Sequence, residues 1–159
     1  MSDVLTPEQR RFCMSRIRSR DTKPEMTIRK GLWSLGYRYR VGTALPGKPD
    51  IVFPRERLAV FIDGCFWHRC SRHYQAPATN PQFWEKKINR NVERDRLVDR
   101  ELASLGWKVK RIWEHEVRED PLRVIEDLIL LLKSVGEKSS PKRMRGASFS
   151  PPPSSPPQP

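Results

Sequence analysis

Two short apolar runs, separated by four turn-forming residues, constrain the fold of this chain more than any other feature. The runs are Ile51-Val52-Phe53 and Leu58–Ile62, and the charged segment Pro54-Arg55-Glu56-Arg57 lies between them. Runs rich in β-branched and aromatic residues that are joined by a short charged turn predict a β-hairpin. We therefore expect a β-sheet built around residues 51–62.

Helix signals lie on both sides of the predicted hairpin. Proline at the first helical position and glycine after the last one are typical of helix ends. The expected elements, in order, are a helix after Thr6, a helix from Thr22 to Gly36, an extended segment Tyr37–Val41, the hairpin, a helix from Asn80 to about Leu105, a strand Trp107–Trp113 and a helix after Asp120. This order predicts an α/β fold with a mixed central β-sheet flanked by helices.

The chain divides into a predicted domain and a tail. Its 159 residues leave room for one domain with its own core. At Glu137 the composition shifts to Ser, Pro, Lys and Arg with almost nothing apolar to bury, which is typical of disordered segments. We expect one domain over residues 1–136 and a disordered basic tail over residues 137–159.

The formal net charge is +12, and the isoelectric point is near 10.2. Such a surplus attracts polyanions, partly through release of counterions from a phosphate backbone. Nucleic acid is the expected partner, although a protein that is merely basic has the same composition. No apolar stretch approaches the roughly 20 residues of a membrane span, and no signal-like segment opens the chain. We therefore expect a cytoplasmic protein without a membrane partner.

Two acidic residues lie at one end of the predicted hairpin. Asp50 precedes the first strand and Asp63 follows the second, so antiparallel pairing brings both carboxylates to the same end of the sheet. Mg²⁺ prefers one or two such carboxylates, with water and substrate phosphate completing its shell. Pro49-Asp50 followed by an acid on the next strand is the pattern of the PD-(D/E)xK nuclease superfamily, with Cys65 in the place of the lysine. Asp50 alone would by default be a turn residue.

Cysteine and histidine residues after the hairpin have the spacing of a metal site. Cys65, Cys70 and His73 follow the pattern C-x4-C-x2-H, and His115 lies far along the chain. Four Cys and His ligands without an open position are typical of structural zinc. The alternative for Cys65 and Cys70 is a buried thiol, which is also the role expected for Cys13 in the first helix.

Several separated motifs occur in a fixed order between about Arg16 and Val135. They are Arg20-Asp21-Thr22, Pro46–Asp50, Asp63–His68, Asn91–Asp95, Leu105-Gly106-Trp107 and Ile112-Trp113-Glu114. Together they resemble the very short patch repair (Vsr) DNA mismatch endonucleases, a family within the PD-(D/E)xK superfamily. The resemblance implies a restriction-endonuclease-like fold with a structural zinc site.

The resemblance also implies an activity. The family nicks one DNA strand next to the T of a T:G mismatch that arises from deamination of 5-methylcytosine. It implies a Mg²⁺-dependent phosphodiester hydrolase that acts on double-stranded DNA and is functionally linked to a cytosine-5 DNA methyltransferase. We expect a monomer in the bacterial cytoplasm, associated with the nucleoid when bound to DNA.

Three catalytic residues are carried over from the family. Asp50 matches its metal-binding aspartate, His68 the histidine that activates the attacking water, and Glu25 a helix glutamate near the site. An imidazole titrates near neutral pH, which suits a general base. Glu25 also lies three residues after Thr22, as in a capping box, and His68 would otherwise be a zinc ligand or a packed histidine.

The chain departs from the best-known family pattern at two places. Ile62-Asp63 replaces a Thr-His pair, and we expect Asp63 as a direct Mg²⁺ ligand and the carbonyl of Ile62 as a further one. The family's zinc site draws three ligands from the same loop and one from the segment after the Ile-Trp-Glu strand, with a different mix of Cys and His. Cys70 and His73 are therefore assigned to zinc by their spacing.

Aromatic and basic residues are assigned to DNA contacts. By the resemblance, Phe66, Trp67 and Trp84 wedge into the base stack beside the mismatch, where unstacking costs least. The basic residues expected along the phosphate backbone are Lys86, Lys87, Arg90, Arg94 and Arg96. Aromatic residues more often fill cores, as we expect for Trp33, Trp107 and Trp113, and the charged run 85–100 has the alternative of a solvated helix face.

Two alternative functions stay open. A non-catalytic, zinc-containing DNA-binding module would need the Cys and His residues but not Asp50 or Asp63. A related nuclease, restriction-type or specific for damaged DNA, would use the same metal site on another substrate. The replacement at Ile62-Asp63 keeps this second alternative open.

Overall fold

The structure is a computed structural model that describes residues 6–16 and 20–139. Its elements are α1 (Pro7–Ser15), α2 (Lys23–Ser34), β1 (Ile51–Phe53), β2 (Leu58–Asp63), α3 (Pro81–Ser104), β3 (Lys108–Trp113), α4 (Glu114–Glu119) and α5 (Pro121–Ser139). Residues 137–139 belong to α5, and the remainder of the expected tail lies outside the described residues. No helix within the described ranges is long and apolar enough to cross a membrane.

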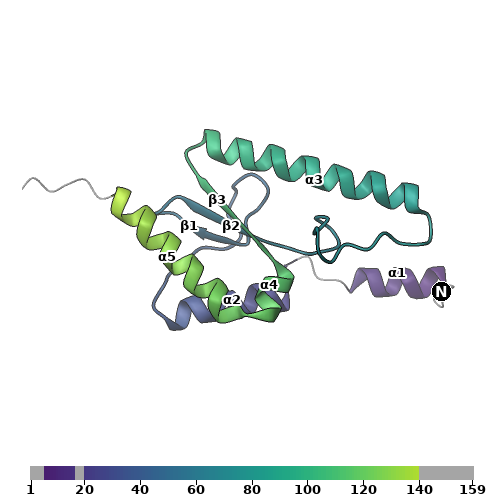
Figure 1. The fold of residues 1–159 in the computed structure, drawn as a ribbon, viewed down its shortest axis with the longest axis horizontal. Helices are drawn as coiled ribbons and strands as arrows, with labels where there is room; N and C mark the ends of the chain where they lie inside the picture. The colour runs from purple at the N-terminus through teal and green to yellow at the C-terminus, as the bar shows by residue number, and fades with distance from the viewer. Residues whose placement is uncertain (1–5, 17–19, 140–159) are drawn as a thin grey trace, which may run out of the picture.

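The sheet has three strands in the order β1-β2-β3. β1 and β2 form the predicted antiparallel hairpin, with Ile51 opposite Val60, and β2 pairs with β3 in parallel, with Leu58 opposite Lys108. The expected mixed sheet flanked by helices is confirmed (Figure 1). Since β1 runs opposite to the other two strands, the start of β1 and the ends of β2 and β3 lie at one end of the sheet.

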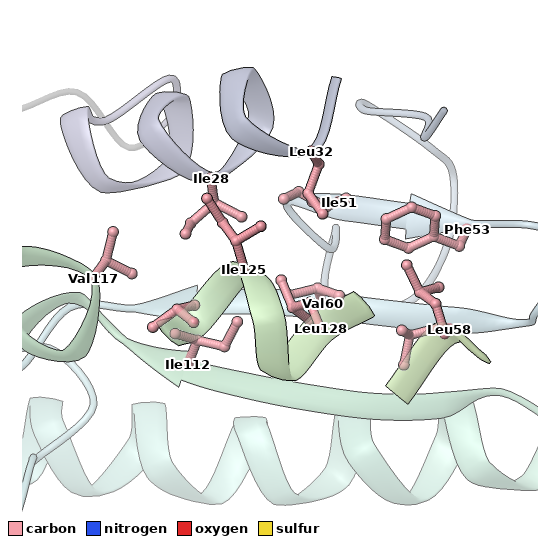
Figure 2. Packing of buried hydrophobic residues seen from close by; sticks show 12 residues of the cluster. Ile28, Leu32, Ile51, Phe53, Leu58, Val60, Ile112, Val117, Ile125 and Leu128 are labelled. Carbon is pink, nitrogen blue, oxygen red and sulfur yellow. The ribbon is translucent and has the colours of Figure 1, made fainter. Parts of the chain in front are cut away.

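The larger core lies between the sheet and helices α2, α4 and α5, while α3 lies on the opposite face (Figures 1 and 2). The labelled residues of this core are Ile28, Leu32, Ile51, Phe53, Leu58, Val60, Ile112, Val117, Ile125 and Leu128. On the other face Ala59 and Phe61 pack against Leu102 of α3. Burial on both faces explains why β2 is almost continuously apolar rather than alternating.

Glycine at position 31 allows α2 and α5 to pack closely. A β-carbon added there would overlap the side chain of Ile125, which is itself buried in the main core. Closely packed interiors accommodate added volume only by shifting neighbours, so the sequence at this contact determines how near the two helices can lie.

Four local expectations need correction. Instead of an extended segment Tyr37–Val41, the structure has only an isolated bridge between Arg40 and Val52 within the described residues. Helix α4 was not expected; it begins where the Glu116 carboxylate accepts a hydrogen bond of 2.8 Å from the Trp113 N–H. Cys13 is exposed rather than buried. The expected core residue Trp33 is 51% exposed, because it projects away from the buried stripe of α2.

Candidate functional site

A cleft of about 1040 Å³ opens at the end of the sheet where β1 begins and β2 and β3 end. The start of α2, the segments flanking β1 and β2, and the middle of α3 contribute its walls. Five residues expected at a catalytic centre lie together in the lining, namely Glu25, Asp50, Ile62, Asp63 and His68. The cleft is therefore the candidate site.

Asp50 is the acidic residue immediately before β1. Its Oδ2 accepts a hydrogen bond of 2.7 Å from the Ile62 N–H. The pKa of Asp50 is raised to about 6: burial is the largest cause, the charges of Glu25 and Asp63 add to the rise, and the Ile62 N–H and Arg29 oppose it. Negative charge concentrated in a poorly solvated position favours a bound cation, and carboxylate oxygen is a ligand that Mg²⁺ prefers.

Glu25 is 3% exposed and lies in a hydrogen-bond network at the start of α2. It accepts hydrogen bonds from the Asp21 N–H at 2.9 Å and the Thr22 hydroxyl at 3.0 Å. Because Thr22 donates to Glu25 instead of accepting from the helix, the reciprocal capping box is not formed. Arg29 Nη2 donates to Glu25 at 3.2 Å and to the carbonyl of Asp50 at 3.0 Å, so this network also positions Asp50.

His68 is oriented by an acidic residue from α3. Its Nδ1 lies 2.5 Å from Asp95 Oδ2. An ionised carboxylate only accepts, so Nδ1 carries the proton and Nε2 is left for proton transfer. Burial lowers the pKa of His68, but the hydrogen bond to Asp95 and the charges of Asp63 and Asp95 outweigh it, and the pKa is raised above its ordinary value.

Asp63 lies against an arginine of the neighbouring strand. Arg111 Nη1 is 3.0 Å from each oxygen of the Asp63 carboxylate. Burial raises the pKa of Asp63, while His68 and Arg111 oppose the rise. Both side chains lie on the α3 face of the sheet, where Arg111 also covers the ring of Phe61 at 4.4 Å. The residue expected as a direct metal ligand is thus one half of an ion pair.

The four expected zinc ligands lie together beside the cleft. Cys65 Sγ is 3.2 Å from His115 Nδ1, and Cys70 Sγ is 3.6 Å from the same nitrogen and 3.8 Å from His73 Nδ1. All four donor atoms lie within 4.8 Å of one another. Neighbouring sulfur and nitrogen ligands of tetrahedral zinc are about 3.5 Å apart. This cluster could therefore hold one metal ion.

The loop that carries these cysteines also carries His68. The Cys70 N–H donates to the carbonyl of Cys65 at 2.9 Å, and the His68 N–H donates to the carbonyl of Gly64 at 3.2 Å. The start of the loop is tied to the first residue of α4 because the Cys65 N–H donates to Glu114 Oε1 at 3.0 Å. The position of His68 is consequently coupled to the geometry of the Cys/His cluster.

The three aromatic residues assigned to DNA form one cluster. The ring centroid of Phe66 lies 5.1 Å from that of Trp67 and 5.4 Å from that of Trp84. Tyr74 and Phe83, which had no predicted role, extend the cluster at 5.9 Å from Phe66 and 5.4 Å from Trp84. Phe66 and Trp67 also line the cleft, and Phe83 is 52% exposed, so the cluster forms a partly open aromatic surface beside the site.

Basic residues of α3 continue this surface. The assigned residues Lys86, Lys87, Arg90, Arg94 and Arg96 are all exposed. Lys87 Nζ lies 5.4 Å from the ring centroids of both Trp67 and Trp84. Four of the five basic residues line a second depression of about 550 Å³, and Arg94 also borders the cleft. The basic helix face and the aromatic cluster therefore adjoin the same opening.

Four residues of the site were missed by sequence reasoning: Arg29, Asp95, Arg111 and Glu114. Asp95 and Glu114 are the last residues of two motifs that carry the family resemblance. Their place in these motifs was the available signal for a role in the site. Arg111 lies two residues after Val109 on a predicted strand, so both side chains point to the same face of the sheet. A charged residue on the face where Val109 packs was the available signal. Arg29 had no comparable signal, because its partner carbonyl lies 21 residues away in sequence.

Comparison with known proteins places the chain among nucleases. A family model described as DNA mismatch endonuclease Vsr matches residues 2–74. The type II nicking enzyme V.NaeI of Lentzea aerocolonigenes is 48% identical over 114 residues, which cover 68% of this chain and 69% of that protein. The type II nicking enzyme V.XorIIP of Xanthomonas oryzae pv. oryzae is 44% identical over 121 residues, which cover 75% and 89%.

A third relative carries the family's own name. DNA mismatch endonuclease Vsr of Escherichia coli (strain K12) is 41% identical over 120 residues, which cover 74% of this chain and 77% of that protein. The aligned length in each of these relatives extends well beyond the segment matched by the family model. On these similarities, the chain belongs to the Vsr family of DNA endonucleases.

Proposed function

We propose that this endonuclease nicks one DNA strand next to the T of a T:G mismatch produced by deamination of 5-methylcytosine. The observation that carries the proposal is the half-buried Asp50 at one end of a cleft whose lining also holds the His68–Asp95 pair. The name of the Escherichia coli relative, DNA mismatch endonuclease, and those of the nicking enzymes agree with a mismatch substrate and a single-strand cut.

The catalytic metal would be Mg²⁺, held by the Asp50 carboxylate and the carbonyl of Ile62. The raised pKa of Asp50 supports this assignment, because a buried carboxylate gains stability when a cation replaces its proton. When bound, Mg²⁺ would polarise the phosphate and stabilise charge in the transition state. Arg29 donates to the backbone carbonyl of Asp50 and is itself held by Glu25, which keeps this end of β1 in place.

His68 would act as the general base. Nε2 would accept a proton from the attacking water, while the hydrogen bond between Nδ1 and Asp95 keeps the imidazole in one tautomer and stabilises the imidazolium that forms. Cys65, Cys70, His73 and His115 would bind a structural zinc ion. Zinc binding would contribute folding free energy to the loop that positions His68.

The aromatic cluster and the basic face of α3 would contact DNA. Phe66, Trp67 and Trp84 would insert beside the mismatch, where unstacking is least costly, and the basic residues would bind phosphates. We further propose that the protein is a monomer with a restriction-endonuclease-like fold. It would be functionally linked to a cytosine-5 methyltransferase and would act in the cytoplasm, at the nucleoid.

A nicking assay tests the proposal. End-labelled duplexes that differ only in T:G against T:A would be incubated with Mg²⁺ or with EDTA. We expect one nick beside the mismatched T, none in EDTA, and none with Asp50→Asn. Asp127→Asn, an exposed position on α5, is the matched control and should nick normally. Absence of cleavage on every duplex would reject the nuclease mechanism, and equal cleavage of both duplexes would indicate a related nuclease with another substrate.

A further inference from the structure

Asp50 and Asp63 lie at the same end of the sheet, but their carboxylates have different partners. Asp50 Oδ2 accepts from a backbone N–H, whereas both oxygens of Asp63 lie 3.0 Å from the guanidinium of Arg111. The Asp63 side chain is also only 7% exposed. A cation already next to a carboxylate offsets its charge, and this weakens its attraction for a second cation. The two acids therefore differ in their readiness to bind a metal.

Arg111 is itself held by several groups. Its Nε lies 3.0 Å and 3.1 Å from the two oxygens of Asp99, and Nη2 lies 2.8 Å from Asp99 Oδ1. The guanidinium also covers the ring of Phe61. An arginine fork with one carboxylate at each side and an aromatic ring below has little freedom to rotate away. The ion pair with Asp63 is consequently a fixed part of the site.

This ion pair adjoins the general base. Asp63 Oδ1 lies 3.9 Å from His68 Nδ1, and Arg111 Nη2 lies 3.8 Å from Asp95 Oδ1 and donates to the Asp95 carbonyl at 3.4 Å. Arg111 thus contacts the two acids that flank the imidazole on its Nδ1 side. The contacts join β3, β2, the loop after β2 and α3 around one ring.

We propose that Asp63 is not a ligand of the catalytic metal but forms with Arg111 a positioning pair, which holds Asp95 and the His68 imidazole for proton transfer. The inference replaces the expectation of Asp63 as a Mg²⁺ ligand. The role of the pair in proton transfer rests on the proposed function, whereas the absence of Asp63 from the metal ligands does not.

Metal binding is measured first, with Mn²⁺ alone and the full-length chain, from the free Mn²⁺ signal in electron paramagnetic resonance. We expect the Mn²⁺ Kd of Asp63→Asn to stay within about threefold of wild type, because only a nearby charge is lost. Asp50→Asn should weaken binding at least about tenfold, because a ligand is lost. Equal weakening by the two variants would overturn the proposal. If wild type binds too weakly for this measurement, the Mg²⁺ concentration that gives half-maximal nicking provides the same comparison.

Nicking kinetics test the positioning role. We expect Arg111→Met to lower kcat about 10- to 100-fold with little change in the KM for DNA, because imidazole orientation affects the chemical step. Arg111→Lys keeps the charge without the fork and should recover only part of the rate. Lys108→Met, an exposed position at the opposite end of β3, is the control. An unchanged kcat for Arg111→Met, or a loss of rate explained by a raised KM, would overturn the positioning role.

The two proposals fail in distinguishable ways. If wild type nicks neither duplex, the proposed function is wrong, and the Mn²⁺ comparison still decides whether Asp63 binds metal. If wild type nicks the T:G duplex but Asp63→Asn requires at least about tenfold more Mg²⁺, the proposed function stands, and the inference that Asp63 is not a metal ligand is wrong. Should Arg111→Met fail to fold, Arg111→Lys and Asp63→Asn carry the kinetic comparison, and full activity in both would overturn the inference.

Discussion

His68 Nδ1 lies 2.5 Å from Asp95 Oδ2, and this contact joins the loop after β2 to the middle of α3. The residues are 27 positions apart in sequence. Their pairing gives an otherwise ordinary acidic residue of a charged helix a defined role, because it decides which ring nitrogen can accept a proton.

Asp95→Asn should therefore impair nicking and move its pH dependence. The rate requires neutral His68, so it rises with pH through the His68 pKa, which Asp95 raises above the ordinary value. Without the carboxylate this pKa falls, and the acidic limb of the pH–rate profile should move to lower pH. We expect kcat to fall about 100- to 10,000-fold from loss of the oriented base. A pH–rate series with saturating Mg²⁺ measures both effects, and an acidic limb displaced to higher pH would contradict the assignment.

Asp50→Asn should stabilise the metal-free protein at neutral and alkaline pH. The pKa of Asp50 is about 6 in the folded state and about 3.9 in an unfolded chain. Since the folded state binds the proton more tightly, this group costs stability as the pH rises from about 4 to about 6. The asparagine variant avoids that cost, by about 1 to 3 kcal/mol above pH 7.

Thermal unfolding in EDTA at pH 4 and pH 8 measures this difference. The Tm gain of Asp50→Asn over wild type should be present at pH 8 and largely lost at pH 4, where the folded wild type is neutral at this position. Asp127→Asn, exposed on α5, should show no gain at either pH. A gain at pH 4 that equals the gain at pH 8 would show that the carboxylate charge is not its cause.

The hairpin could be predicted because its signals are local. Strand β1 has the predicted bounds Ile51–Phe53, and β2 extends only one residue further than expected, to Asp63. The mutual approach of the cysteines and histidines also followed from short spacing in one loop plus a single distant residue. In both cases a few neighbouring residues determine the geometry.

Residues whose partners are distant in sequence could not be predicted in the same way. The contact between Arg111 and Asp63 spans 48 residues and depends on the parallel pairing of β2 with β3.

Helix α4 has six residues and buries only Val117, and one buried residue is too few to give an apolar period. The exposure of Trp33 depends on which face of α2 packs, and hydrophobicity alone does not determine that face.

Removal of the predicted zinc should destabilise the loop that carries His68. Cys70 is buried, and its Sγ contacts two histidine nitrogens. Cys70→Ser should lower the bound zinc from about one ion per chain to near zero and reduce both Tm and nicking. Metal analysis by mass spectrometry measures the first effect. Cys13→Ser, at an exposed cysteine of α1, is the matched control and should keep its zinc. Equal zinc content in the two variants would exclude Cys70 as a ligand.

Trp84 should contribute to mismatch recognition, whereas Trp33 should not. Trp84 lies in the aromatic cluster beside the cleft, with its ring 5.4 Å from that of Phe66. Trp33, near the end of α2, packs against Arg38 and Tyr39 of the segment that follows the helix. It lies outside the lining of the cleft. Stacking of one base on an aromatic ring contributes about 1 to 3 kcal/mol, so Trp84→Ala should weaken binding of the T:G duplex about 5- to 150-fold.

The comparison of the two tryptophan variants separates DNA contact from general loss of stability. Both substitutions replace a tryptophan with alanine. Fluorescence anisotropy gives the Kd of each variant for T:G and T:A duplexes, with Ca²⁺ or EDTA present to prevent cleavage. We expect Trp84→Ala to reduce the preference for T:G and Trp33→Ala to preserve it. If the two variants lose affinity equally for both duplexes, the aromatic cluster is a packing feature, and recognition of the mismatch must then come from the basic face of α3 or from the lining of the cleft.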